Sequence, residues 1–375
     1  MSPVALTNGR VLTPTGFSED CVVIEGDRIA ATLPAPPADA KVVDLGGKML
    51  LPGFIDTQVN GGGGRLFNDD PSVETLRVIA ETHRRYGTTG MLPTLISDDL
   101  DVVAAAIAAV DAAIEAQVPG ILGIHIEGPF LSPKRKGIHP EGKLQPLRDD
   151  YLALLTSLKR GKTLVTLAPE RATPDQIRQL VAAGVIVSAG HSDAPYETVR
   201  AAIDAGLTGF THIYNAMSQL TGRAPGMVGA ALESGDTFAG IIADGHHLHP
   251  ASLRIALAAK GPERLMLVTD AMPSVGSDAP GFELQGRTIH REGDRLVGED
   301  GTLAGSTLTM AGAVRGMIDQ GRVSLETAVA MASATPAAFL SLATHGGIAV
   351  GQSANLLLAD GNLNIEASWI AGIRA

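Results

Sequence analysis

The sequence of 375 residues is poor in cysteine, in aromatic side chains and in positive charge. Its one cysteine, Cys21, excludes an internal disulfide and a metal cluster of several thiolates. Aromatic residues are only 3 %, whereas alanine and glycine are abundant, which suits helices packed closely on a sheet. The net charge of −11 argues against nucleic acid or an anionic membrane as a partner. A small anionic substrate stays compatible, because a pocket can be locally positive.

Long hydrophobic runs are also lacking. An apolar stretch at residues 102–114 is interrupted by Asp111 and is too short to span a bilayer. The N-terminus shows no basic region followed by an apolar segment, so no secretory signal is expected and the protein is predicted to be cytoplasmic. Apolar residues make up 45 % of the chain, which is typical of a globular protein of one large domain or two smaller ones.

The two ends of the chain differ in pattern from its middle. Both ends show short strand-like segments separated by turns, whereas the middle alternates strand and helix patterns eight times. We therefore predict an α/β protein with a (β/α)8 TIM-type barrel at residues 53–345 and a small β-sandwich domain built from residues 1–52 and 346–375. An inserted β-hairpin is expected at 281–298. The alternative, an open doubly wound sheet, needs a glycine phosphate fingerprint after the first strand, and residues 61–64 lack that spacing.

Polar residues follow the predicted strands at their carboxyl ends, where barrel enzymes place their chemistry. The strand at residues 121–127 carries His125 and Glu127 on one face, and it is apolar enough to be buried on both sides. A carboxylate at the tip of such a strand is costly unless it is paired or binds a metal. The other strand ends carry Gln58, Asn60, His191, His212, Asn215, Asp244, His246, His247 and Asp270.

Three of these residues are suited to one divalent metal. Glu127, His191 and His212 are ligands that Zn²⁺ or Fe²⁺ accepts, and such a set leaves an open coordination position. Any one histidine alone would be interpreted as a buried structural residue, but three ligands at strand tips favour a shared metal. Asp270 could cap the next helix or act as a general base, and its strand-end position favours the base. His125 is expected to support Glu127 from behind.

Two loops carry further candidates. The loop after the third strand holds three cations at residues 134–136 and also His139, and it forms either a mobile basic lid or a solvated charged loop. The segment 211–226 places Asn215 and Arg223 among glycines, which suits a phosphate or a carboxylate. An exposed arginine is nevertheless most often a solvated surface residue.

Seven short motifs together resemble those of one known family. They are Pro52-Gly-Phe-Ile-Asp56, His125-Ile-Glu-Gly-Pro-Phe130, Gly190-His-Ser192, Thr211-His-Ile-Tyr-Asn-Ala-Met217, Ala243-Asp-Gly-His-His247, Val268-Thr-Asp-Ala271 and Leu303-Ala-Gly-Ser-Thr307. The chain is similar over most of its length to the N-acetylglucosamine-6-phosphate deacetylase family of the amidohydrolase superfamily. The Thr-His-Ile-Tyr-Asn-Ala-Met motif is the most specific of the seven.

The resemblance implies metal-dependent hydrolysis of the acetamide of N-acetyl-D-glucosamine 6-phosphate, in amino-sugar catabolism or cell-wall sugar recycling. It implies one divalent metal on Glu127, His191 and His212, with zinc favoured over iron, cobalt or manganese. Asp270 is then the general base and later the acid, and His139 donates a hydrogen bond to the acetyl oxygen. The implied substrate contacts are Ile138, Asn215, Ala216, Arg223, His247, Leu303, Ala304 and Gly305.

The resemblance also implies a homodimer, with Arg223 reaching the neighbouring active site. One departure concerns the first strand, where many amidohydrolases place His-x-His for a second metal. This chain has Gln58-Val59-Asn60 there, and amides are poor ligands for transition metals beside imidazole, so a single metal is predicted. The alternative hypotheses are another amidohydrolase, such as a cyclic amidase or an N-acyl amino acid deacylase, and a barrel that binds without catalysis.

Overall fold

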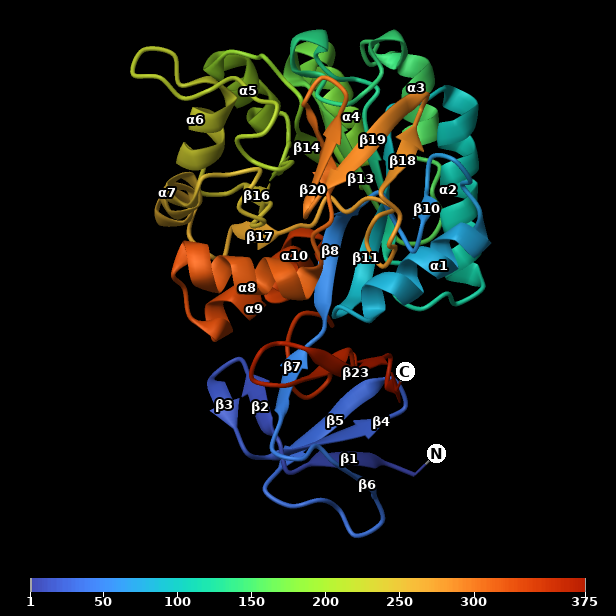
Figure 1. Cartoon of the computed structure of the whole chain (residues 1–375), viewed down its shortest axis with the longest axis vertical. Helices are drawn as coiled ribbons and strands as arrows, with labels where there is room; N and C mark the ends of the chain where they lie inside the picture. Colours follow the sequence, from blue (N-terminus) through green and yellow to red (C-terminus); the bar gives the residue numbers. More distant parts are fainter. Residues whose placement is uncertain (1, 375) are drawn as a thin grey trace.

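A barrel forms the upper part of the molecule in Figure 1, and strands from both chain ends form a smaller part below it. The computed structural model describes residues 2–374. Eight parallel strands form the barrel sheet in the order β17-β16-β15-β14-β13-β12-β11-β8. They are β8 (Phe54–Val59), β11 (Thr88–Ile96), β12 (Gly123–Glu127), β13 (Lys162–Leu167), β14 (Ile186–Ala189), β15 (Gly209–Phe210), β16 (Phe238–Ile241) and β17 (Leu265–Leu267).

The first and last strands of this sheet meet and close the barrel. Val59 and Ala271 form a parallel bridge, and the amide of Asp270 donates to the carbonyl of Gln58 at 3.0 Å. The buried carboxylate of Asp56 spans the same seam, because the amide of Thr269 donates to it at 3.3 Å. The predicted (β/α)8 barrel is confirmed.

Helices surround the barrel and bury its outer face. They are α1 (Val73–Arg84), α2 (Leu100–Glu115), α3 (Asp149–Leu155), α4 (Pro174–Ala182), α5 (Tyr196–Asp204), α6 (Gly226–Glu233), α7 (Pro250–Lys260), α8 (Met310–Gly321), α9 (Leu325–Ala332) and α10 (Ala334–Phe339). The start of α4 shows why they begin where they do, because Thr173 and Gln176 cap each other's amides and Pro174 needs no hydrogen-bond partner. None of the helices within residues 2–374 is long and apolar enough to cross a bilayer.

Strand β12 divides its residues between the two faces of the barrel wall. Ile124 and Ile126 are buried in the large apolar cluster that also contains buried residues of the surrounding helices. His125 and Glu127 lie on the opposite face, inside the barrel, where His125 contacts Thr94 and Thr166 of the neighbouring strands. The alternation predicted from the sequence is therefore what aims Glu127 at the site.

Strands from both chain ends form two facing sheets, ordered β5-β4-β1-β6 and β24-β23-β22-β7-β2-β3. Their bounds are β1 (Val4–Thr7), β2 (Arg10–Thr13), β3 (Gly16–Ser18), β4 (Cys21–Glu25), β5 (Arg28–Leu33), β6 (Lys41–Asp44), β7 (Met49–Pro52), β22 (Leu356–Ala359), β23 (Ile365–Ile370) and β24 (Ile373–Arg374). Leu6 and Ile29 of the first sheet share one apolar cluster with Leu50 and Trp369 of the second. The termini thus combine in a β-sandwich, as expected, while the boundaries at 52 and 346 stay predictions.

The insertion after the last barrel strand is larger than the hairpin predicted at 281–298. It is an antiparallel sheet of four strands, β18 (Gly281–Leu284), β19 (Arg287–Glu292), β20 (Arg295–Gly298) and β21 (Leu303–Ser306). Its buried Leu284 and Ile289 pack with Ile96, the last residue of β11, and with Met272, which follows β17. The insertion therefore covers part of the barrel mouth. A short antiparallel hairpin, β9 (Gly61–Gly62) and β10 (Arg65–Leu66), follows β8 in the sequence.

Candidate active site

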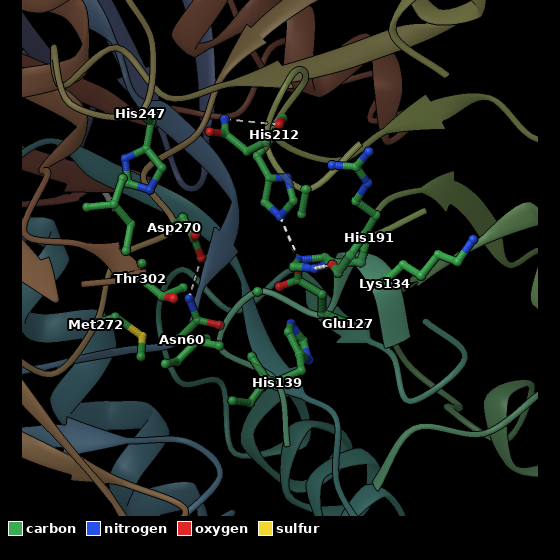
Figure 2. Close-up of a pocket in the computed structure, with 18 residues that line it drawn as sticks. Asn60, Glu127, Lys134, His139, His191, His212, His247, Asp270, Met272 and Thr302 are labelled. Carbon is green, nitrogen blue, oxygen red and sulfur yellow. Dashed lines mark hydrogen bonds and ion pairs between the residues drawn. The ribbon is translucent and has the colours of Figure 1, made fainter. Parts of the chain in front are cut away.

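A cavity of about 380 Å³ opens at the carboxyl ends of the barrel strands (Figure 2). Its walls combine strand ends, the loop after β12 and the inserted sheet. The lining residues are Asn60, Ile96, Glu127, Lys134, Arg135, Gly137, Ile138, His139, His191, His212, Asn215, Ala216, His247, Asp270, Met272, Thr302, Leu303 and Gly305. Of the residues predicted for the site, only Arg223 and Ala304 are missing from this wall.

Glu127, His191 and His212 point toward one another in Figure 2. The Nε2 atoms of the two histidines are 3.0 Å apart, and Glu127 Oε1 lies 3.2 Å from His191 Nε2 and 3.1 Å from His212 Nε2. Ligand atoms about 2.0–2.1 Å from a tetrahedral zinc lie roughly 3.3 Å apart, so the triangle has the size that such an ion requires.

The hydrogen bond at His191 Nδ1 indicates that this triangle fits a cation. Its Nδ1 lies 2.8 Å from the carbonyl oxygen of Arg135, which can only accept, so Nδ1 carries the proton. In the neutral ring Nε2 then presents a lone pair to the Glu127 carboxylate. Two electron-rich atoms at 3.2 Å repel unless a positive charge lies between them. His212 Nδ1 has no such partner among residues 2–374.

A second grouping of possible ligands includes His139, one ring nitrogen of which lies within 4.8 Å of ligand atoms of Glu127 and His191. The triangle with His212 is tighter, with all three distances between 3.0 and 3.2 Å. This difference favours His212 as the third metal ligand, and it leaves His139 free to contact the substrate.

Burial raises the pKa of Glu127, but the two neighbouring imidazoles of His191 and His212 outweigh it and hold this pKa well below its ordinary value. The carboxylate is therefore charged in the folded chain. A buried negative charge facing two imidazoles is the electrostatic environment in which a divalent cation binds.

Three of the ionisable site residues adopt backbone conformations that side chains seldom allow. The φ angles of His191, His212 and Asp270 are 48°, 33° and 52°. Left-handed geometry at non-glycine residues is uncommon and concentrates at functional sites. Here it turns each side chain inward just after its strand ends, which explains why three short strands converge on one point.

Asp270 lies beside the triangle and is held by side-chain amides at the end of β8. Its Oδ1 accepts from Asn60 Nδ2 at 2.7 Å and from Gln58 Nε2 at 3.2 Å. Gln58 Nε2 also donates to Glu127 Oε2 at 3.1 Å. The strand-one amides thus present N–H groups, not lone pairs, to both carboxylates. Burial first, and then the charge of Glu127, raises the pKa of Asp270 to about 6.

His139 lies deep in the cavity although it belongs to a long loop. Only 2 % of its surface is exposed. Burial first, and then the neighbouring His191, lowers the pKa of His139 well below its usual value, so the ring is neutral. The cations before it are partly paired, because Asp193 contacts Arg135 Nε at 2.8 Å and Lys134 Nζ at 3.5 Å.

The opposite wall carries the residues predicted to bind the substrate. Asp244 Oδ2 lies 2.7 Å from His247 Nδ1, which orients that ring. Ala304 is buried behind the wall, in the cluster with Met272. Gly305 has a φ of +61°, and a Cβ there would lie 2.7 Å from the Asp270 carbonyl oxygen, so only glycine lets β21 pass this close.

Arg223 is exposed and does not line the cavity of its own chain. It belongs to residues 219–224, all exposed, in the loop between β15 and α6. The expectation that Arg223 serves a neighbouring site is compatible with this position and stays a prediction.

Some residues of the site were not predicted from the sequence. Ser97, which contacts His139, ends the apolar run of β11, so the rule that placed the other strand-end residues could have found it. Gln58 and Asn60 were expected at a strand end and as replacements for metal ligands, but their contacts with Glu127 and Asp270 were not predicted, although their positions two residues apart already put them on one face. Met272 and Thr302 reach the cavity through loop conformations that leave no such pattern.

Comparison with known proteins supports a family assignment. The sequence profile described as the amidohydrolase family matches residues 49–374. The N-acetylgalactosamine-6-phosphate deacetylase of Shewanella sp. (strain ANA-3) is 48 % identical over 97 % of this chain and 93 % of its own length. The N-acetylglucosamine-6-phosphate deacetylase of Haemophilus influenzae is 34 % identical over 98 % of both chains.

Solved structures agree with these sequence matches. The N-acetylglucosamine-6-phosphate deacetylase of Pasteurella multocida superposes with a TM-score of 0.96 at 34 % identity, over 100 % of this chain and 99 % of the other. A mutant of the Mycobacterium smegmatis deacetylase, in complex with N-acetyl-D-glucosamine-6-phosphate, gives 0.91 at 33 % identity, again over 100 % and 99 %. The chain therefore belongs to the amidohydrolase family and, within it, to the family of the N-acetylglucosamine-6-phosphate and N-acetylgalactosamine-6-phosphate deacetylases.

Proposed function

We propose that this chain hydrolyses the acetamide of N-acetyl-D-glucosamine 6-phosphate to D-glucosamine 6-phosphate and acetate. The observation that carries the proposal is the triangle of Glu127, His191 and His212 beside Asp270, in a chain related to such deacetylases over nearly its whole length. A cyclic amidase or a catalytically inactive barrel is less well supported, because neither class occurs among the relatives described above.

The three residues of the triangle would hold one divalent metal, and zinc suits two imidazoles and a carboxylate best. When bound, such an ion supplies a Lewis acid that polarises a carbonyl and lowers the pKa of water. The side-chain amides of Gln58 and Asn60 argue for one metal ion and not two. Their N–H groups already face Glu127 and Asp270, so they offer no lone pair to a second ion there.

The chain's own groups then carry the proton transfers. Asp270 accepts the proton of the attacking water and delivers it to the departing sugar nitrogen. The amides of Asn60 and Gln58 keep one oxygen of Asp270 occupied, so the other is left for this transfer. His139, which is neutral, donates a hydrogen bond to the acetyl oxygen as negative charge develops on it.

In this proposal the phosphate of the substrate binds next to Asn215, Ala216 and His247. Asp244 orients His247 through the contact of 2.7 Å, so that its other nitrogen faces the cavity. Arg223 of a second subunit completes the phosphate site in a homodimer. A guanidinium can form paired hydrogen bonds with a phosphate, and this contact positions the sugar relative to the catalytic groups.

An acetate-release assay tests the function directly. Acetate is expected from N-acetylglucosamine 6-phosphate, with a kcat/KM well above that for unphosphorylated N-acetylglucosamine, because the phosphate contacts bind only the former. N-acetylgalactosamine 6-phosphate is the second candidate, since the Shewanella relative at 48 % identity carries that activity in its name. Absence of acetate from both sugar phosphates with the metal-loaded enzyme would exclude the proposal.

Replacement of Arg223 by alanine is expected to raise KM for the phosphorylated sugar and to leave kcat nearly unchanged. The loss of a charge-assisted contact to phosphate is worth about 1.5–3 kcal/mol, or roughly 10- to 100-fold in KM. The measurement is steady-state kinetics on the phosphorylated and unphosphorylated sugars. Arg178→Ala, on the exposed face of α4, is the matched control, because its partner is Asp175 on the same helix.

Mixing two variants tests whether Arg223 acts across subunits. In a mixed dimer of Arg223→Ala and Asp270→Asn chains, one site has an intact Asp270 and receives an intact arginine from its partner. Activity at low substrate is therefore expected to rise above that of either variant alone. No rise, in a mixture shown to contain mixed dimers, contradicts the placement of Arg223 in the neighbouring site.

A further inference from the structure

We infer that Ser97 is a positioning residue that selects the tautomer of His139, so that Nε2 carries the ring proton and faces the substrate. The inference rests on the proposed function, in which His139 donates to the acetyl oxygen. Ser97 directly follows β11 and is 1 % exposed. Two of its groups contact the same ring nitrogen: Ser97 Oγ lies 2.8 Å from His139 Nδ1, and the Ser97 amide lies 3.3 Å from it.

The backbone amide of Ser97 decides the direction of these contacts. An amide N–H can only donate, and its hydrogen points at His139 Nδ1. A proton on Nδ1 would face that hydrogen, so Nδ1 must present its lone pair. The hydroxyl of Ser97 can then donate to the same atom. A neutral imidazole has one ring proton, which is left on Nε2.

The remaining nitrogen is free to act on a ligand. His139 lines the cavity, and no residue within 2–374 forms a hydrogen bond with its Nε2. The opposite tautomer would place a lone pair there, which repels an acetyl oxygen that is gaining negative charge. The tautomer therefore decides whether His139 assists or opposes the reaction.

Neighbouring groups hold Ser97 in this position. Gln285 Nε2, from the inserted sheet, donates to the Ser97 carbonyl at 3.0 Å. Gly128, directly after Glu127, has a φ of +90°, and a Cβ there would lie only 2.2 Å from Ser97 Oγ. Glycine at 128 thus leaves the space that the hydroxyl occupies. The arrangement joins the end of β11, the end of β12 and the loop that carries His139.

Replacement of Ser97 by alanine removes the shorter of the two contacts to Nδ1 and keeps the longer one from the backbone amide, so the preference for the Nε2-protonated ring is weakened. We expect kcat to fall by roughly 10- to 100-fold, the size usual for residues that orient a group of the site. KM and metal content are expected to change little, because the hydroxyl contacts the His139 ring and the backbone carbonyl of Glu127, but no side chain of the metal triangle among residues 2–374. Ser97→Thr keeps a hydroxyl and is expected to restore most of the activity. Ser274→Ala is the matched control, since Ser274 is buried and its hydroxyl has no partner among residues 2–374.

The decisive readout is the protonation of the ring nitrogens, measured by ¹⁵N NMR on histidine-labelled, zinc-loaded enzyme and assigned with a His139→Gln variant. The wild type and Ser274→Ala are expected to show an unprotonated Nδ1 and a protonated Nε2 for His139. Ser97→Ala is expected to show an increased share of the Nδ1-protonated form.

Two results would overturn the inference. One is an unchanged kcat in Ser97→Ala, and the other is a lower kcat with the nitrogen signals unchanged, which would mean that Ser97 acts only through packing. Failure of the proposed function is distinguishable, because it would appear as absence of acetate release in the wild type. The wild-type NMR signals then still decide the tautomer, and a protonated Nδ1 there refutes the inference on its own.

Discussion

Replacement of Asp270 by asparagine is expected to lower kcat by about 100-fold or more, the usual size of general acid–base catalysis, while the metal stays bound. Asparagine has nearly the same shape and can still accept from Asn60 and Gln58, which contact only Oδ1. It cannot take a proton from water or deliver one to the sugar nitrogen. The measurement is kcat for acetate release, with metal content and thermal unfolding followed in parallel.

The pH dependence of the wild type gives an independent check of Asp270. Only the ionised carboxylate can act as a base, and burial raises its pKa to about 6 in the metal-free chain. Acetate release is therefore expected to fall as the pH drops through this region. A bound cation favours the ionised form and moves the midpoint to lower pH. If Asp270→Asn keeps near-normal turnover and the same fall in activity at low pH, Asp270 is not the general base.

Replacement of Glu127 by glutamine is expected to abolish metal binding at stoichiometric levels, and with it activity. The carboxylate is the member of the triangle that supplies a negative charge, and its Oε1 lies within 3.2 Å of both imidazoles. A neutral amide oxygen of the same shape is a much weaker ligand. Affinity is expected to fall by more than the roughly 10- to 100-fold typical for residues that merely support a ligand.

Metal analysis and competition with a chromogenic chelator measure this loss. The wild type is expected to hold about one equivalent per chain, and a content near two would contradict the single site inferred from Gln58 and Asn60. Glu115→Gln, on the exposed part of α2, is the control, because the carboxylate of Glu115 pairs with Arg160 and lies outside the cavity wall. If Glu127→Gln kept a full equivalent of metal at unchanged affinity, Glu127 would not be a ligand.

Much of the barrel could be predicted because its signals are local. The alternation of β12 and the polar residue at the end of each strand are visible within a few residues, and the geometry of parallel strands then brings those ends together. The prediction was less accurate where structure depends on distant contacts. The hairpin expected at 281–298 is part of a sheet of four strands.

The sequence by itself determined the fold class, the family and the residue types at the strand ends, since periodicity and short motifs carry that information. Only the tertiary structure decided how those residues meet: the triangle at 3.0–3.2 Å, the amides of Gln58 and Asn60 on Asp270, and Ser97 on His139. The physical reason is that these contacts join residues from 21 to 212 positions apart. They depend on left-handed backbone turns and on loop paths that nearest-neighbour patterns do not encode.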